Sequence, residues 1–240
     1  MTPKTGTLYG IGMGPGDPEL ITLKALKVLE RVPHIFASCS TKNNYSLALS
    51  IVRSHLNGAG IEHLPFPMTR EPKALEEAWD RNARRVLEVL HTGADAAFVT
   101  LGDPLTYSTF GYLLKTLKRL YPEVSIITIP GITSYSAAAA LTHIPLTEGE
   151  ESCYLVSGAL GPAKLKEIVD KTDNIVMLKT YRHFDEIYRA LEELDLLDRA
   201  TCISLCGLEG ETVVEDLREL KGRPLPYLSM IIIKKEGRGY

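Results

Sequence analysis

A glycine-rich loop near the N-terminus constrains this chain more than any other feature. Residues 10–20 read GIGMGPGDPEL; they follow a short apolar run and precede a pattern with helical spacing. A second Gly-Asp-Pro, at residues 102–104, again follows an apolar run, at residues 96–101. Two strand-end loops of this composition predict one cleft that is built from backbone rather than from charged side chains.

Hydrophobic periodicity predicts alternating strands and helices through the first part of the chain. This rhythm is typical of a mainly parallel sheet covered on both faces. Right-handed crossovers then bring the carboxyl ends of the strands to one edge, where open α/β sheets bind ligands, so the two Gly-Asp-Pro loops are expected to converge. The expected strands lie at residues 7–11, 34–37, 96–101 and 124–129, and the expected helices at 20–30, 46–56, 73–91, 110–120 and 136–140.

The pattern changes after Pro145, where Gly149 and a cluster of glutamates follow. We therefore predict two α/β domains, at residues 1–146 and 147–240. The second domain is richer in strands and is expected to have a mixed sheet. Its expected strands lie at residues 153–157, 175–178, 201–206, 212–215 and 227–234, and its helices at 164–169 and 184–194.

Composition excludes several classes of protein. The 240 residues carry a net charge of −3, which gives no electrostatic case for binding nucleic acid or an anionic membrane. No apolar run reaches the ~20 residues of a membrane helix, and no signal-peptide core is visible, so a cytoplasmic location is expected. The four cysteines form no Cys-x-x-Cys pair, which predicts free thiols and no protein-bound metal.

The first loop does not fit the common phosphate-binding fingerprints. A dinucleotide fingerprint that starts at Gly10 needs glycine at position 15, which is Pro15, and one that starts at Gly12 needs glycine at position 17, which is Asp17. A P-loop is excluded because no Gly-Lys-Ser/Thr follows. Proline fixes φ and removes a donor, so this loop is expected to be a stiff wall, with Asp17 capping the next helix. Such a cap leaves the repeated glycines unexplained.

Two further loops have the same form as the first. Residues 100–109 read TLGDPLTYST, and Asp103 there is either a turn residue or a carboxylate that faces a ligand. Residues 129–134 read IPGITS and open a helix of small residues.

Trp79 and the leucines of the helix at 73–91 are expected in the core.

These three loops resemble those of the tetrapyrrole (corrin and porphyrin) methyltransferases, and the match runs in order over essentially the whole chain. Within that family, TLGDPLTYST and PYLSM, at residues 226–230, resemble the branch that methylates carbon 20 of precorrin-2 or cobalt-factor II. The resemblance implies a two-domain α/β homodimer in cobalamin biosynthesis. It also implies that S-adenosylmethionine binds in a trough between the domains.

The resemblance also assigns roles to individual residues. The implied cofactor contacts are Pro15, Leu101, Gly102, Asp103, Thr106, Thr133, Ser134, Leu178, Cys206, Gly207 and Leu208. The implied substrate contacts are Gly14, Asp17, Tyr107, Tyr181 and Arg182. The second-domain segment VMLKT, at residues 176–180, departs from the family's commoner aromatic-Met-Gly pattern, so an offset of one residue stays open there.

The implied reaction is in-line transfer of the sulfonium methyl group to carbon 20, which yields S-adenosylhomocysteine. Asp103 is a candidate base for later proton loss, although a structural or cofactor-binding role is favoured. Cobalt would arrive inside the macrocycle rather than at a protein site. The alternatives are another tetrapyrrole methylase such as a uroporphyrinogen-III C-methyltransferase, a non-catalytic tetrapyrrole-binding protein, and a nucleotide-binding oxidoreductase, which Pro15 disfavours. For Tyr181 and Arg182 the alternative is a solvated helix start.

Overall fold

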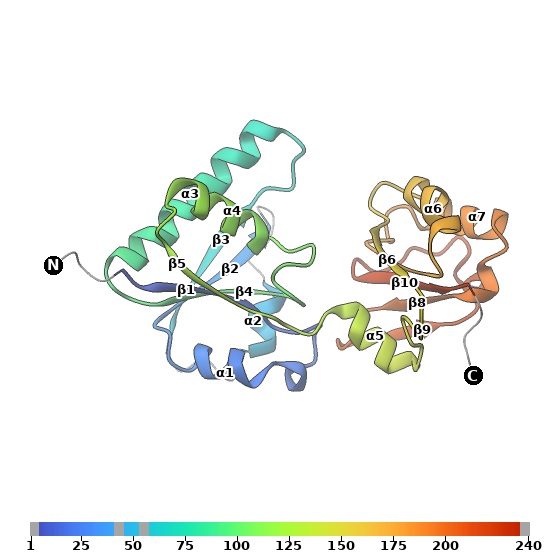
Figure 1. Ribbon diagram of the computed structural model, residues 1–240, viewed down its shortest axis with the longest axis horizontal. Coiled ribbons are helices and arrows are strands. Elements are labelled where there is room, and N and C mark those ends of the chain that lie inside the picture. Colours follow the sequence, from blue (N-terminus) through green and yellow to red (C-terminus); the bar gives the residue numbers. More distant parts are fainter. Residues whose placement is uncertain (1–4, 41–45, 53–57, 236–240) are drawn as a thin grey trace. The chain divides into compact units, whose positions relative to one another are not determined.

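The computed structural model describes residues 5–40, 46–52 and 58–235. The chain divides into two compact units, Met1–Thr133 and Ser134–Tyr240, and each contains one five-stranded sheet with helices (Figure 1). The predicted fold class, two α/β domains with a parallel and a mixed sheet, is therefore confirmed.

The sheet of the first unit is parallel throughout, in the order β3-β2-β4-β1-β5. Its central strand β4 is buried at every residue, as expected for a strand covered on both faces. The strands are β1 (Thr7–Gly12), β2 (His34–Ser40), β3 (Gly60–Phe66), β4 (Ala96–Thr100) and β5 (Ser125–Ile129).

Strand β3 was not predicted from the sequence. It is an edge strand that pairs only with β2, so its outer side needs no partner and tolerates polar residues and proline. Glu62, His63 and Pro65 therefore interrupt the apolar pattern that marks the inner strands.

Four helices cover the two faces of this sheet. Helices α1 (Leu23–Leu29) and α2 (Leu47–Val52) lie on one face, and α3 (Pro72–His91) and α4 (Phe110–Leu120) on the other (Figure 1). Strand residues alternate between the two core layers; for example, Ile35 packs with α1 and α2, and Phe36 with α3 and α4.

The helix predicted at residues 20–30 is in fact two elements. Asp17 caps a short 3-10 helix, Pro18–Leu20, and the hydroxyl of Thr22 then caps α1 by accepting a hydrogen bond from the Ala25 amide at 3.2 Å. For the helix predicted at 46–56, the structure gives α2, and residues 53–56 lie outside the described part of the chain.

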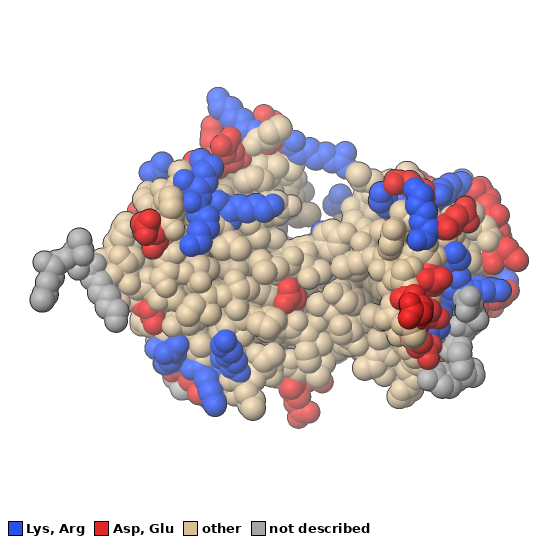
Figure 2. Space-filling model, viewed as in Figure 1, with Lys and Arg blue, Asp and Glu red and all other residues tan. Residues whose placement is uncertain are grey.

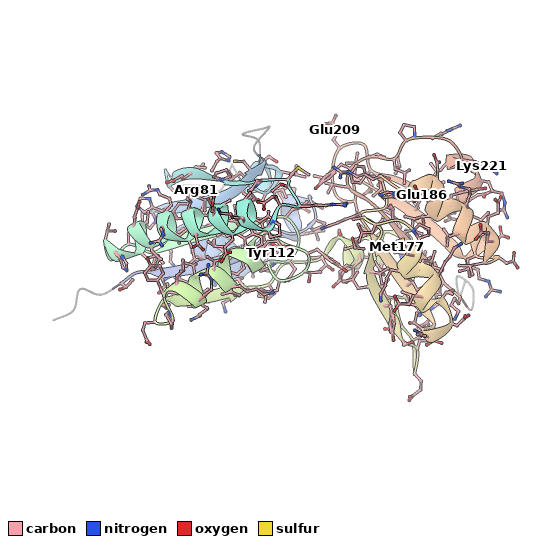
Figure 3. The ribbon with its side chains drawn as sticks, turned by 90° about the horizontal axis from the view of Figure 1, so that it is seen from above. Arg81, Tyr112, Met177, Glu186, Glu209 and Lys221 are labelled. Atoms are coloured by element: carbon pink, nitrogen blue, oxygen red, sulfur yellow. The ribbon has the colours of Figure 1, made fainter. Side chains whose placement is uncertain are left out.

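Trp79 is half-buried rather than fully enclosed in the core. Its ring stacks on that of Tyr112, with 4.6 Å between the centroids, and the two line a groove of about 430 Å³ between α3 and α4 (Figure 3 labels Tyr112). The sequence pattern places Trp79 on the inner stripe of α3, but it could not show that α4 offers a partly exposed tyrosine there.

The second unit has a mixed sheet in the order β6-β7-β10-β8-β9, in which only the pair β6 and β7 is parallel. Its central strand β10 is buried along its whole length. The strands are β6 (Cys153–Ser157), β7 (Asn174–Leu178), β8 (Ala200–Ser204), β9 (Thr212–Val214) and β10 (Ser229–Lys234).

Helices cover both faces of this second sheet. Helices α6 (Ala163–Ile168) and α7 (Phe184–Glu193) pack on one face, in a core layer that includes Met177 (Figure 3). Helix α5 (Ser134–Thr142) packs on the other face, through Ala138. Three 3-10 helices complete the unit, at Val169–Lys171, Leu197–Arg199 and Leu217–Leu220.

The position of α5 explains why the compact units divide earlier than the predicted boundary at residues 146 and 147. The sequence signals for a linker, Pro145 and Gly149, lie after α5, but α5 packs against the second sheet. The chain therefore enters the second unit at the start of this helix.

The face of the molecule seen in Figure 2 has no dominant charge. Figure 2 shows basic and acidic side chains interspersed on the visible face, in keeping with the small net charge. Among the described residues, no helix is both long enough and apolar enough to cross a membrane.

Candidate functional site

The carboxyl ends of β1 and β4 form a switch point in the first sheet. These strands are neighbours, but the chain leaves β1 toward β2 by way of α1 and leaves β4 toward β5 by way of α4, on the opposite face. The loops after the two strands therefore start side by side and diverge. Open α/β sheets bind ligands at such a point, and both Gly-Asp-Pro loops lie there.

Backbone hydrogen bonds join these two loops directly. The Met13 amide donates to the Thr100 carbonyl at 2.9 Å, and Gly14 and Gly102 exchange amide-to-carbonyl bonds of 3.3 and 2.7 Å. The predicted convergence of the two loops is thus confirmed. The two segments are far apart in sequence, so only the parallel order of the strands brings them together.

Close packing of the backbone requires glycine at position 12, which the cap at Asp17 does not explain. A Cβ on Gly12 would lie 2.5 Å from the Gly102 carbonyl oxygen and 2.6 Å from the Gly131 nitrogen. Gly14 has a φ of +79°, which glycine adopts at little cost. These glycines let the three loops pack on one another, so their first role is structural.

Asp103 braces the same loops with its carboxylate. Oδ1 accepts hydrogen bonds from the Leu105 amide at 2.9 Å and from the Thr106 hydroxyl at 3.3 Å, and Oδ2 accepts one from the Gly131 amide at 3.2 Å. Asp103 is therefore a turn residue that also joins the loop after β4 to the loop after β5. This geometry suits a brace better than a proton acceptor.

The rest of the loop after β4 is ordered by hydroxyl groups. The Thr100 hydroxyl lies 2.9 Å from that of Ser108, and the Ser108 oxygen accepts a bond from the Phe110 amide at the start of α4. Between them, Tyr107 has a φ of +50° and is half-exposed. Ser108 was not predicted as a site residue, although a serine near the start of a helix is a recognisable cap signal.

Other predicted contacts lie in these loops or directly after them in the chain. Pro15 is buried in the loop after β1. Asp17 accepts a hydrogen bond from the Glu19 amide at 2.8 Å, which confirms its predicted role as a cap. Leu101 and Thr133 follow β4 and β5 and are half-buried, and Ser134 begins α5.

A Cβ on Gly102, whose φ is +66°, would meet no atom within 4 Å. The space in front of this glycine is therefore open, although its carbonyl is bonded to Gly14. A half-buried carboxylate, hydroxyls and open backbone gather here, and these groups can donate and accept hydrogen bonds.

In the second unit, Ser229 joins the ends of three strands. Its carbonyl accepts bonds from both the amide and the hydroxyl of Thr180, after β7, and its hydroxyl lies 2.7 Å from that of Ser204, at the end of β8. Lys179 and Leu205, which follow β7 and β8, have φ values of +60° and +55°. This local strain is typical of functional edges.

The predicted cofactor contacts of the second unit lie at this edge. Leu178 and Cys206 belong to the core layer under α5, and the Gly207 amide donates to Glu211 at 2.6 Å, with Leu208 following. Cys206 lies just beyond β8, which ends at Ser204, because the αL turn at Leu205 breaks the strand that was predicted to reach residue 206.

The chemistry of Cys206 is that of an inert thiol. Burial raises the pKa of the Cys206 thiol to about 11, and the neighbouring Glu211 makes a smaller contribution in the same direction. Burial also raises the pKa of Cys202 to about 11. Since the thiolate is the reactive form, neither side chain is suited to act as a nucleophile near neutral pH.

Tyr181 and Arg182, the predicted substrate contacts, lie at the same edge together with Tyr227. The Tyr181 and Tyr227 rings make an edge-to-face pair with 5.0 Å between centroids, and the Arg182 guanidinium lies 5.4 Å from the centre of the Tyr181 ring. Tyr227 was not predicted as a site residue, although the motif PYLSM that contains it was noted.

No group of three His, Cys, Asp or Glu side chains in the described part of the chain could hold a metal ion.

Comparison with known proteins decides the family. The family model of tetrapyrrole (corrin/porphyrin) methylases matches residues 7–221. The chain belongs to this family. It is 37% identical over 236 residues to a probable cobalt-precorrin-2 C(20)-methyltransferase of Methanocaldococcus jannaschii, and the match covers 95% of this chain and 96% of that protein.

A second relative is named for the same activity as the first. The cobalt-precorrin-2 C(20)-methyltransferase of Salmonella typhimurium is 34% identical, with 96% of this chain and 97% of that protein covered. Among solved structures, uroporphyrin-III C-methyl transferase from Thermus thermophilus, complexed with S-adenyl homocysteine, shares the fold. Its TM-score is 0.65 at 22% identity, and the match covers 96% of this chain and 99% of that one.

Proposed function

We propose that this chain is an S-adenosylmethionine-dependent methyltransferase that methylates carbon 20 of a precorrin-2-type macrocycle in cobalamin biosynthesis. The support is the sequence identity of 37% and 34%, over nearly the whole chain, to two relatives named as C(20)-methyltransferases, the first as a probable one. The three joined loops at the switch point add to it. Both relatives are named for cobalt-precorrin-2, so a cobalt-loaded macrocycle, cobalt-precorrin-2 or cobalt-factor II, is favoured over metal-free precorrin-2.

The cofactor is proposed to bind at the joined loops of the first unit. Leu101, Gly102 and Asp103 offer open backbone and a carboxylate, and Thr106 offers a hydroxyl that Asp103 holds at 3.3 Å. Pro15 forms a stiff wall beside them, because its φ is fixed. Thr133, the last residue of the first unit, and Ser134, the first residue of the second, are further proposed cofactor contacts. Gly14, Asp17 and Tyr107 are assigned to the substrate.

Bound S-adenosylmethionine supplies an already activated, electrophilic methyl group. The task of the chain is therefore to hold and orient its two ligands, and positioning of this kind contributes up to ~7–11 kcal/mol in good cases. Asp103 acts by fixing the loops after β4 and β5, since three donors already use its carboxylate oxygens. The proposal assigns it no proton transfer.

Contacts from the second unit are a separate part of the proposal. They comprise Leu178, Cys206, Gly207 and Leu208 for the cofactor, and Tyr181 and Arg182 for the substrate. Variants at these positions test this part independently of the loops in the first unit.

Transfer of an isotope-labelled methyl group tests the proposed reaction. The purified chain is incubated with S-adenosylmethionine carrying a 13C methyl group and with either cobalt-loaded or metal-free precorrin-2. The expected product carries the label at carbon 20 and forms faster from the cobalt-loaded substrate. A label at another ring position would make the chain a different tetrapyrrole methylase, and no transfer would favour a non-catalytic tetrapyrrole-binding protein.

Assembly and location complete the proposal. We expect a cytoplasmic homodimer, and light scattering during size-exclusion chromatography measures its mass against the 26.5 kDa of one chain.

A further inference from the structure

The edge of the second sheet carries an unusual combination of aromatic and cationic groups. We call Tyr181, Arg182 and Tyr227 the aromatic platform. Tyr227 is 62% exposed, Arg182 is exposed, and Tyr181 is half-buried between them. The two tyrosine rings meet edge to face, and the guanidinium lies over one of them.

Hydrogen bonds hold the backbone beside the platform. Thr180, next to Tyr181, bonds twice to the Ser229 carbonyl, at 3.4 Å from its amide and 3.2 Å from its hydroxyl. The Ser229 hydroxyl donates to the Pro226 carbonyl at 2.7 Å, next to Tyr227. Ser229 is itself only 3% exposed. One buried residue thus fixes the backbone on both sides of the aromatic pair.

Arg182 has no carboxylate partner among the described residues. Its neighbour His183, in contrast, lies 3.2 Å from Glu186 in the first turn of α7 (Figure 3 labels Glu186). A guanidinium that lies on an aromatic ring is held in a limited set of orientations and keeps its N–H donors available. Such a group suits a carboxylate from outside the chain.

We propose that the aromatic platform binds a flat, polycarboxylate macrocycle, with Tyr227 as a further substrate-contacting residue. The guanidinium of Arg182 takes a carboxylate side chain of the ring, and the tyrosine pair packs on the apolar body of the ring. Arginine and carboxylate pair through two parallel hydrogen bonds, and aromatic rings favour contact with other π systems. This inference rests on the proposed function because tetrapyrroles are flat rings with carboxylate side chains.

A direct binding titration tests the platform without requiring catalysis. The probe is uroporphyrin, a stable porphyrin with carboxylate side chains, and its absorbance and fluorescence report binding to the full chain. We expect Arg182→Gln to weaken binding about tenfold, as loss of a charge-assisted pair does. Tyr227→Leu is expected to weaken it about fivefold. Added salt should reduce the affinity of the unmodified chain more than that of Arg182→Gln.

Matched controls lie at the other end of the same sheet. Arg199 is an exposed arginine just before β8, and Tyr154 is a 41%-exposed tyrosine near the start of β6. Arg199→Gln and Tyr154→Leu should leave the affinity for uroporphyrin within about twofold. If these controls weaken binding as much as the platform variants, or if the platform variants do not weaken it, the inference is overturned.

Binding of S-adenosylhomocysteine separates this inference from the proposed function. The platform variants should bind it with unchanged affinity, because they are predicted to affect the macrocycle alone. If the chain binds S-adenosylhomocysteine and Arg182→Gln binds uroporphyrin as well as the unmodified chain does, the proposed function stands and the role of the aromatic platform is wrong. If uroporphyrin binding needs Arg182 but the chain does not bind S-adenosylhomocysteine, the role of the aromatic platform stands and the proposed function is wrong.

Discussion

The backbone of two neighbouring loops leaves no room for a side chain at Gly12. A Cβ there would lie 2.5 Å from the Gly102 carbonyl oxygen, so Gly12→Ala must push the loops apart. Overpacking of this kind costs about 1–3 kcal/mol of the free energy of unfolding. Urea unfolding of the purified variant measures this loss.

Gly111 provides the matched control for this substitution. It lies in the first turn of α4, and a Cβ on it would meet nothing within 4 Å. Alanine is the better helix former, so Gly111→Ala should keep the stability or raise it by up to about 0.5 kcal/mol. Equal stability of Gly12→Ala and Gly111→Ala would contradict the close packing of the loops.

Substitution of Asp103 tests whether its carboxylate holds the loops together or accepts a proton. In Asp103→Asn an amide donor replaces one acceptor oxygen, so either the Gly131 amide or the donors of Leu105 and Thr106 lose a partner. We expect the affinity for S-adenosylhomocysteine to fall about tenfold, in line with a hydrogen bond to a charged group. The rate of transfer at saturating cofactor should change little.

Calorimetry and steady-state kinetics together check this prediction. If Asp103→Asn bound the cofactor normally and lost turnover, Asp103 would be a proton acceptor. The bracing role would then be wrong.

At the scale of single residues, the sequence predicted that the two Gly-Asp-Pro loops meet, but not the contacts that each residue makes there. The cap at Asp17 could be predicted because its partner lies two residues away. The bond from Gly131 to Asp103 could not be predicted, since it depends on β4 and β5 lying on either side of β1. Tyr227 was missed for the same reason: its partner Tyr181 is close only through the pairing of β7 with β10.

Among the elements, β10 is tied to the loop after α5 by a buried lysine. Lys234 is only 4% exposed and contacts Glu148 at 2.6 Å and Glu151 at 3.1 Å. Burial alone would lower the pKa of Lys234, but these two carboxylates outweigh it and raise the pKa. Hydrogen bonds from Asn174 and then from Lys234 lower the pKa of Glu151 below its ordinary value of 4.5.

This network gives the stability a definite dependence on pH. The folded-state pKa of Glu151 is depressed, so its contribution is fully present above pH 4.5 and is lost as the pH falls below that value. Glu151→Gln should be less stable than the unmodified chain at about pH 7 and should lose less stability on acidification. Urea unfolding on both sides of pH 4.5 measures the difference.

The neighbouring Glu150, which is exposed, supplies the control for this experiment. Glu150→Gln should follow the unmodified chain at every pH. An identical acid response of Glu151→Gln and the unmodified chain would show that the network does not hold the loop.

The elements also show where sequence patterns stop being informative. Strands covered on both faces, such as β4, and amphipathic helices, such as α4, could be predicted almost to the residue. The edge strand β3 could not be predicted, because an edge tolerates polar residues and proline. The predicted boundary followed Pro145 and Gly149, whereas the packing of α5 on the second sheet determines where the units divide.

For the molecule as a whole, membership of the family and the fold are established, and the central claim is that the chain binds S-adenosylmethionine. A ligand that binds only the folded state also stabilises it, by about 2.7 kcal/mol at a hundredfold excess over its Kd. Unfolding in the presence of S-adenosylhomocysteine should therefore need more urea than unfolding without it. The same concentration of NAD should have no effect.

Isothermal titration of the purified chain with S-adenosylhomocysteine, with NAD as the control, tests this claim most directly. We predict saturable binding of S-adenosylhomocysteine with a Kd in the micromolar range, about −8 kcal/mol, and no heat from NAD. Heat from NAD and none from S-adenosylhomocysteine would contradict the account. It would mean that the joined loops at the switch point serve a dinucleotide and not a methyl donor.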